Sequence, residues 1–226
     1  MDKHERKVLT MLFSTNKTLH DAKTSNHYRL NSITEFNEKY MQKIEDVSVA
    51  PLEIPLQKIR NEMYNILIFS REYVDFLSNI PSINIYDAAE IIVEVGDIGR
   101  FDNRKHFISY AGLSPVLKKN NKTYKVTKYG QGICVANKKY DNVDYCENLK
   151  IVLTRCTQKM IKNDKDYGQY YRDSFQDYQS KHPKYHKNRL HLMALKKTTV
   201  KFAKKVYNKF NEIKDIEEYE KIKYEG

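Results

Sequence analysis

Residues 79–115 read NIPSINIYDAAEIIVEVGDIGRFDNRKHFISYAGLSP, and this stretch decides the expected fold. It opens on a short turn that contains a proline. An apolar helical pattern follows from about Tyr86 to Val95, and Gly96 is placed to end that helix. Since an apolar helical segment also precedes the turn, the order is helix, I-P-x-I turn and helix. This order is the sequence shape of a helix-hairpin-helix.

A hairpin of this kind points backbone N–H groups at the start of its second helix towards a phosphate. Such a contact carries no sequence information. The turn of the usual hairpin holds glycines, and here Ser82 and Asn84 take their places. Asparagine tolerates the left-handed backbone better than most residues, although a side chain hinders close approach to a phosphate. We therefore expect a nucleic-acid contact at Ser82, Ile83 and Asn84.

The segment before the turn has apolar positions spaced alternately three and four residues apart, which is a heptad seam. Its members are Leu56, Ile59, Met63, Ile66, Ser70, Tyr73 and Leu77. Two interpretations remain open, an ordinary core helix and a coiled coil that forms a homodimer through Leu56–Leu77. We expect a helical linker over residues 51–78. Residues 1–50 are polar and weakly periodic, so they form a poorly defined N-terminal segment.

A basic loop follows the stretch on its other side, with aromatic residues between its lysines. Alternation from Thr123 to Thr127 predicts a small β-ribbon or an extended loop. Lysines and tyrosines in such a loop suit phosphate contact and base stacking, although a flexible exposed hairpin explains them equally simply. The lysines are Lys118, Lys119, Lys122, Lys125 and Lys128.

Residues 188–210 form the clearest amphipathic pattern, with an apolar stripe for burial and lysines on the opposite face. That face either binds nucleic acid or is merely solvated. The lysines are Lys197, Lys201, Lys204 and Lys205. Tyrosines within 166–180 recur at helical spacing, which favours core packing over a stacking surface. An acidic helical tail is expected over 211–226.

Composition supports a polyanionic partner. Lys and Arg number 40 against 29 Asp and Glu, a net charge of +11. Nucleic acid is the commonest such partner, although the 18 tyrosines and absence of tryptophan also fit a coding bias of AT-rich genomes. The 3 cysteines form no C-x-x-C pair, which indicates reduced thiols in a cytoplasmic protein. No apolar run is long enough for a membrane helix. No cysteine accompanies His182, His186 and His191 at finger spacing, so we expect no metal site.

The order of these features resembles the C-terminal domain of the insertion-sequence one-ten (one-sixteen/nine-oh-two) transposase family, kin of the Piv and MooV DNA invertases. That pattern runs I-P-G-[IV]-G, then alanines on a helix, then E-[IV]-G-D-[IV]-x-R-F and Y-x-G-L-x-P. The resemblance covers about Leu56 to Phe210, and it is long and ordered. The matching residues are Ile80, Pro81, Ile83, Ala88, Ala89, Glu94, Gly96, Asp97, Ile98, Arg100, Phe101, Tyr110, Ala111, Gly112, Leu113 and Pro115.

The resemblance implies a transposase C-terminal DNA-binding domain over residues 79–210, with DNA as partner and a guide RNA that selects the sites. In the family an N-terminal RuvC-like domain carries four acidic residues that bind divalent metal. A C-terminal serine is proposed to attack the DNA phosphodiester. A helical coiled-coil segment joins the two domains and dimerises.

Two departures from the family pattern concern catalysis. The chain before Leu56 is too short for a whole RuvC-like domain. Its nearest match to the family's K-T-D-x-x-D-A motif has Ser25 and Tyr28 at the aspartate positions, so we expect no cofactor in this chain. The serine positions are occupied by Lys119 and Asn120, which cannot form a phosphoserine. Thr123 is the nearest downstream hydroxyl, although it is out of register.

The sequence therefore predicts a mainly α fold, in which a helical linker or coiled coil precedes a helix-hairpin-helix-containing domain with a small β-ribbon. We expect a truncated transposase part that binds nucleic acid and does not cleave it alone. Two alternatives are an active hydroxyl-dependent DNA recombinase and a non-catalytic dimerising helical protein.

Overall fold

A computed structural model describes residues 1, 3–31, 38–80, 82–114, 117–120, 123–126 and 145–225. The chain divides into two compact units, Met1–Val74 and Asp75–Gly226. Each unit is described by itself below. The described residues are predominantly helical, so the expected mainly α class is confirmed.

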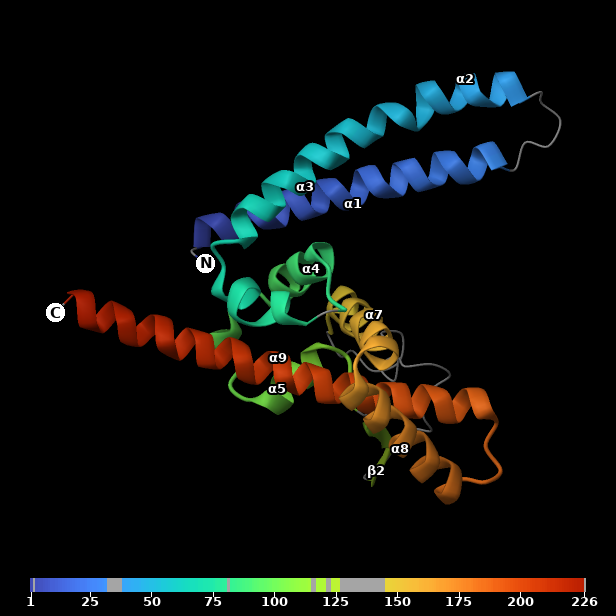
Figure 1. The fold of residues 1–226 in the computed structure, drawn as a ribbon. Helices are drawn as coiled ribbons and strands as arrows, with labels where there is room; N and C mark the ends of the chain where they lie inside the picture. The colour runs from blue at the N-terminus through green and yellow to red at the C-terminus, as the bar shows by residue number, and fades with distance from the viewer. Residues whose placement is uncertain are drawn as a thin grey trace. The chain divides into compact units, whose positions relative to one another are not determined.

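The first unit is a helical hairpin. Helix α1 (Lys3–Asn31) runs out, and α2 (Glu38–Ser48), a 3-10 turn (Ala50–Leu52) and α3 (Glu53–Leu67) return alongside it (Figure 1). Pro55 stands in the first turn of α3, where its missing N–H breaks no helical hydrogen bond. The segment 1–50, for which the sequence predicted little order, thus contains α1, the longest helix of the hairpin, and α2.

The heptad seam belongs to this hairpin only in its first half. The seam residues Leu56 and Met63 are buried on α3, as is Leu67 beside the seam, whereas Ile59 and Ile66 are half-buried. Helix α3 packs against α1 of the same chain. The single helix expected to continue to Leu77 is wrong, because α3 ends at Leu67 and a turn follows. A homodimer through Leu56–Leu77 stays a prediction, but the described seam already has a partner within the chain.

A buried polar contact accounts for the break. The Ser70 hydroxyl donates to the Glu72 carboxylate over 2.7 Å, and the Arg6 guanidinium donates to that carboxylate over 3.2 Å. Both Ser70 and Glu72 are buried. The helix ends in a tighter turn, in which the Phe69 N–H donates to the Ile66 carbonyl three residues earlier, and this turn accommodates the two buried side chains. Ser70 therefore does not extend the apolar seam, and the regular helix ends before it.

The second unit begins within irregular helical turns and is then built from regular helices. A π-helix (Glu72–Phe76) and a 3-10 turn (Leu77–Asn79) lead to α4 (Ile85–Val95). The further elements are the 3-10 turn η4 (Ile98–Arg100), α5 (Arg104–Tyr110), α7 (Glu147–Asn163), α8 (Lys165–Lys181) and α9 (Lys187–Glu225).

Helix α9 forms the axis of the second unit, and α5, α7 and α8 pack along it (Figure 1). Its predicted apolar stripe is buried: Phe202 and Val206 are completely inaccessible, and Tyr167 of α8 meets Phe202 edge-on with ring centroids 6.3 Å apart. Ile213 is also buried, so the core extends past position 210. The residues expected as a separate acidic tail continue α9 to Glu225.

Two short strands, β1 (Leu117–Asn120) and β2 (Thr123–Val126), pair antiparallel. Their register places Asn120 opposite Thr123 and Lys119 opposite Tyr124. The side chains of both strands lie outside the described residues. Within the described part of the chain, no helix is both long and apolar enough to cross a membrane.

Candidate nucleic-acid interface

The turn before α4 is closed by a capping box. Asn84 is the N-cap, and its side chain accepts the Asp87 N–H over 2.9 Å, while the Asp87 carboxylate accepts the Asn84 N–H over 3.4 Å. The φ angle of Asn84 is −85°, so the left-handed backbone that motivated its comparison with glycine is not used. Asn84 begins the helix through its side chain.

Asp87 also anchors α4 to α7. Its carboxylate is 2% exposed and pairs with Arg155 over 2.9 Å and with Lys159 over 2.5 Å. Arg155 pairs in addition with Glu90, one turn further along α4. Two carboxylates of one helix thus meet two cations of the other, which satisfies charges that would be costly to bury alone. The burial of Cys156 beside this network, together with the negative charge of Asp87, raises the pKa of its thiol to about 12.

The capping box affects the phosphate contact expected at Ser82, Ile83 and Asn84. The positive end of the α4 dipole already faces the carboxylate of Asp87, and two N–H groups of the turn bond within it. Ser82 is buried, and among the described residues its hydroxyl has no hydrogen-bond partner. A phosphate contact there stays a prediction, and the geometry leaves it fewer donors than a glycine turn would.

The E-x-G-D-x-x-R-F motif forms a structural clasp between the end of α4 and the start of α7. The Glu94 carboxylate accepts from the Cys146 thiol over 3.0 Å and from the Asn148 amide over 2.9 Å. The Arg100 guanidinium donates to the Glu94 carbonyl over 3.2 Å and lies 4.4 Å from the centre of the Tyr110 ring. These contacts use the motif's charged residues to hold the fold.

Two glycines of the stretch have backbones that favour glycine. Gly96 ends α4 at a φ of 62°, as the sequence predicted, and Gly112 has a φ of 64°. A Cβ at Gly112 would come within 2.7 Å of the Tyr145 ring and 3.1 Å of Lys150. Gly112 therefore allows the start of α7 to pack closely on the G-L-x-P turn.

The basic face predicted on α9 lies beside tyrosines of α8. The Lys201 ammonium is 4.3 Å from the centre of the Tyr170 ring, and the Lys197 ammonium is 5.5 Å from that of Tyr178. Lys204 and Lys205 are exposed further along the same helix. Tyr167 is buried as core packing requires, whereas Tyr170 and Tyr178 are only half-buried. We call Lys197, Lys201, Lys204, Lys205, Tyr170 and Tyr178 the basic tyrosine face.

Carboxylates neutralise this face only in part. Asp177 lies 3.9 Å from Lys197 and 2.7 Å from Lys181, and the hydrogen bond from Lys181 lowers the pKa of its carboxyl. The charge on the basic tyrosine face is therefore mixed, with cations grouped beside half-buried rings.

The loop predicted as a second basic contact is described only in its strand backbones. Lys118, Lys119 and Lys125 belong to β1 and β2, and only their backbone is described. Lys122 and Lys128 lie outside the described residues. The family serine positions, Lys119 and Asn120, fall on β1. The register places Thr123 directly across from Asn120.

The three clustered histidines do not converge on one another. His182 stacks on Tyr185 with ring centroids 4.6 Å apart, and the His191 Nδ1 shares a 2.7 Å hydrogen bond with the Tyr171 hydroxyl. Among the described residues no three His, Cys, Asp or Glu side chains gather into a metal-binding group. That this chain holds no metal stays a prediction.

Comparison with known proteins agrees with the resemblance seen in the sequence. The model of the family described as "Transposase IS116/IS110/IS902 family" matches residues 74–131. The matched segment includes α4, the clasp residues Glu94 and Arg100, α5 and both strands. No curated protein matches this chain.

Replacing Gly112 with alanine should destabilise the second unit by about 1–3 kcal/mol, because the left-handed backbone disfavours a Cβ and the Tyr145 ring occupies its place. Urea unfolding followed by circular dichroism measures the change. Gly99→Ala is the matched control: its backbone is not left-handed, and its Cβ would meet mainly the flexible end of Lys214. Equal losses in the two variants would contradict the account.

Proposed function

We propose that this chain is the nucleic-acid-binding part of a DNA transposition system, because its residues 74–131 match the model of the transposase IS116/IS110/IS902 family. The basic tyrosine face carries the proposal. It combines ammonium groups, which suit phosphates, with half-buried aromatic rings beside them. Contacts of this kind bind the backbone of duplex DNA without reading its sequence.

The net charge of +11 supports the same conclusion. The cations of the α4–α7 contact are already neutralised by carboxylates, so the attraction for DNA has to come from other basic residues. Arg155 and Lys159 pair with Asp87, so they cannot supply the attraction for DNA. Lysines of α9 can do so. The lysines of the loop 117–128 and the turn Ser82–Asn84 are proposed as further contacts on the same DNA, and a guide RNA is proposed as a second ligand.

Strand cleavage is not part of the proposed activity of this chain alone. A phosphodiester attack that forms a covalent intermediate needs a hydroxyl or an equivalent nucleophile, and Lys119 and Asn120 occupy the family serine positions. The divalent metal of the family belongs to its RuvC-like domain, and we propose no metal in this chain. The clasp residues Glu94 and Arg100 are engaged in holding the fold.

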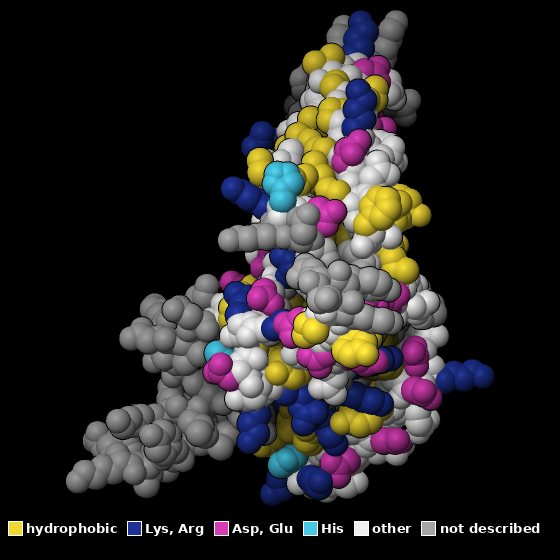
Figure 2. All heavy atoms as spheres, turned by 90° about the vertical axis from the view of Figure 1, so that its left-hand side faces the viewer, with side chains coloured by type: hydrophobic (Ala, Val, Ile, Leu, Met, Phe, Trp, Pro, Cys, Tyr) yellow, Lys and Arg dark blue, Asp and Glu magenta, His cyan; other side chains and the backbone are white. Residues whose placement is uncertain are grey.

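One observation favours an active recombinase as a second candidate. The register of β1 and β2 places Thr123 opposite Asn120, so a hydroxyl-bearing residue lies next to a family serine position across the ribbon. Another observation favours a dimerising protein. On the first unit, Met11, Val47 and Ile54 are more than half exposed, and hydrophobic side chains are visible on the upper part of Figure 2.

Replacing Lys197 and Lys201 together with glutamine should weaken binding to duplex DNA and lower the slope of log K against log salt by roughly 2, since each lost phosphate contact removes about 0.9. Fluorescence anisotropy over a salt series measures this slope. The charge-matched control replaces Lys43 and Lys58, both exposed on the first unit. Absence of binding by the unaltered chain at low salt would refute the proposal and favour the dimerising protein.

No covalent protein–DNA adduct should form when the chain is incubated with circular donor DNA and magnesium, because the serine is absent. Denaturing electrophoresis of labelled DNA detects such an adduct. An adduct that disappears in Thr123→Ala and persists in Ser114→Ala would establish the active recombinase instead.

A further inference from the structure

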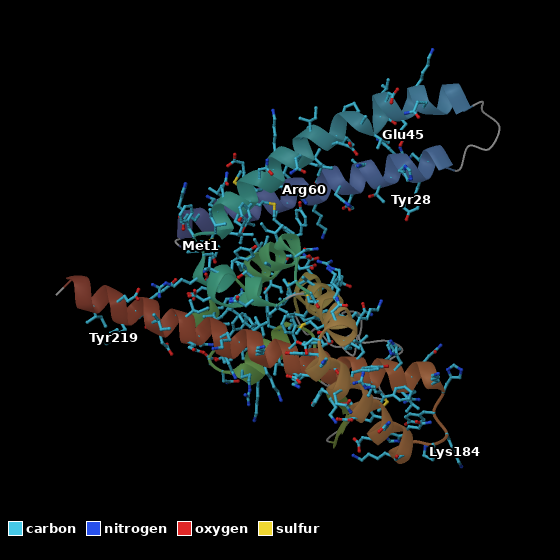
Figure 3. All side chains as sticks on the ribbon, in the orientation of Figure 1. Met1, Tyr28, Glu45, Arg60, Lys184 and Tyr219 are labelled. Atoms are coloured by element: carbon cyan, nitrogen blue, oxygen red, sulfur yellow. The ribbon has the colours of Figure 1, made fainter. Side chains whose placement is uncertain are left out.

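A separate pocket lies between α8 and the first turns of α9, near the turn that joins them. It encloses about 360 Å³. Its aromatic walls are Tyr171 and Phe175 of α8 and His191 of α9. Figure 3 places Lys184 at the neighbouring turn. A cavity of this size is at the lower end of the range of about 300–1,000 Å³ for small-molecule sites, so it has room for one planar ring system.

The rings of the pocket are held in a fixed arrangement. The Tyr171 hydroxyl and the His191 Nδ1 share a hydrogen bond of 2.7 Å, and their rings meet at 71° with centroids 5.7 Å apart. Phe175, one turn after Tyr171, lies 6.3 Å from it at an interplanar angle of 38°. Rings ordered in advance lose little conformational freedom when a flat ligand stacks on them.

The polar lining matches the other parts of a nucleotide. Gln176 and Asn188 provide amides that can both donate to and accept from the edge of a base. Arg172 and Lys187 provide cations for the phosphate attached to it. None of the residues that line the pocket is acidic, so the pocket suits an anionic ligand.

The turn beside the pocket strengthens this charge. Residues 181–189 read KHPKYHKNR and contain no acidic residue. Arg189 lies over the Tyr185 ring at 3.9 Å, and His182 stacks against that ring, so two further basic side chains are ordered next to the pocket. A strand whose base enters the pocket would therefore have its backbone beside cations on this turn.

We propose that this pocket binds an unpaired nucleobase of a single-stranded nucleic acid, stacked against Tyr171, Phe175 and His191. This proposal rests on the proposed function only in taking the ligand to be a nucleic acid. It adds a site distinct from the basic tyrosine face. Stacking on aromatic side chains is how proteins retain single strands with little sequence preference. The pocket takes a base that has left a duplex or never belonged to one.

Because the chain contains no tryptophan, one substitution gives the pocket its own fluorescent reporter. In the Phe175→Trp variant of the full chain, a single-stranded oligonucleotide should quench the tryptophan emission. An abasic strand of the same length, which keeps the phosphates, should leave the emission unchanged. DNA and RNA strands are tested in parallel arms to distinguish the two sources. The control is Tyr219→Trp, at a position 69% exposed on the distant part of α9 (Figure 3).

Affinity provides an independent readout. Phe175→Ala should weaken single-strand binding by about fivefold or more, the effect of losing one base–aromatic stack, and should leave duplex binding unchanged. Phe175→Tyr keeps a ring in place and should retain the affinity. Circular dichroism confirms that each variant is folded.

The outcomes separate this proposal from the previous one. Quenching by single strands without any duplex binding would sustain the pocket and refute the basic tyrosine face as a duplex site. Equal quenching by abasic strands, equal quenching in the control, or equal loss of single-strand and duplex affinity in Phe175→Ala would overturn the pocket. Absence of any single-strand binding would overturn it as well.

Discussion

The contact of Asp87 and Glu90 with Arg155 and Lys159 is the interaction on which the second unit depends. It fixes α4, the first regular helix of the family segment, against α7, and α7 in turn packs on α8 and α9. The Asp87 carboxylate also accepts from the N–H of the N-cap Asn84, so the start of the helix and its attachment share one carboxylate. A buried carboxylate has to keep its cationic partners, so these pairs determine where α4 packs on α7.

This arrangement changes what the family motif means here. Glu94 and Arg100, charged residues in a motif of a DNA-processing family, bond to α7 and to the chain's own backbone. The helix start that a hairpin would offer to a phosphate already holds an internal anion. Cations with aromatic rings beside them are available to a ligand on α9 and at the α8–α9 turn. The match to the transposase family model and the basic tyrosine face therefore lie on different parts of the chain.

Much of this fold could be predicted from sequence, because helices leave a periodic trace. The stripe through Phe202 and the end of α4 at Gly96 were both predictable. The break of the seam at Ser70 was not, since it depends on Glu72 and Arg6, and Arg6 is distant in sequence. The pocket was missed for a similar reason: Tyr171 and Phe175 have core-like spacing, and only their tertiary contact with His191 reveals a binding shape. The run KHPKYHKNR was the available signal.

Lysine footprinting tests the central claim, that the lysines of α9 carry the main contact with DNA. The chain is acetylated briefly with and without duplex DNA, and mass spectrometry measures the modification of each lysine. The account predicts that DNA protects Lys197 and Lys201, while Lys58 on the first unit and Lys159, engaged by Asp87, react equally in both samples. Equal modification of Lys197 and Lys201 with and without bound DNA would contradict it.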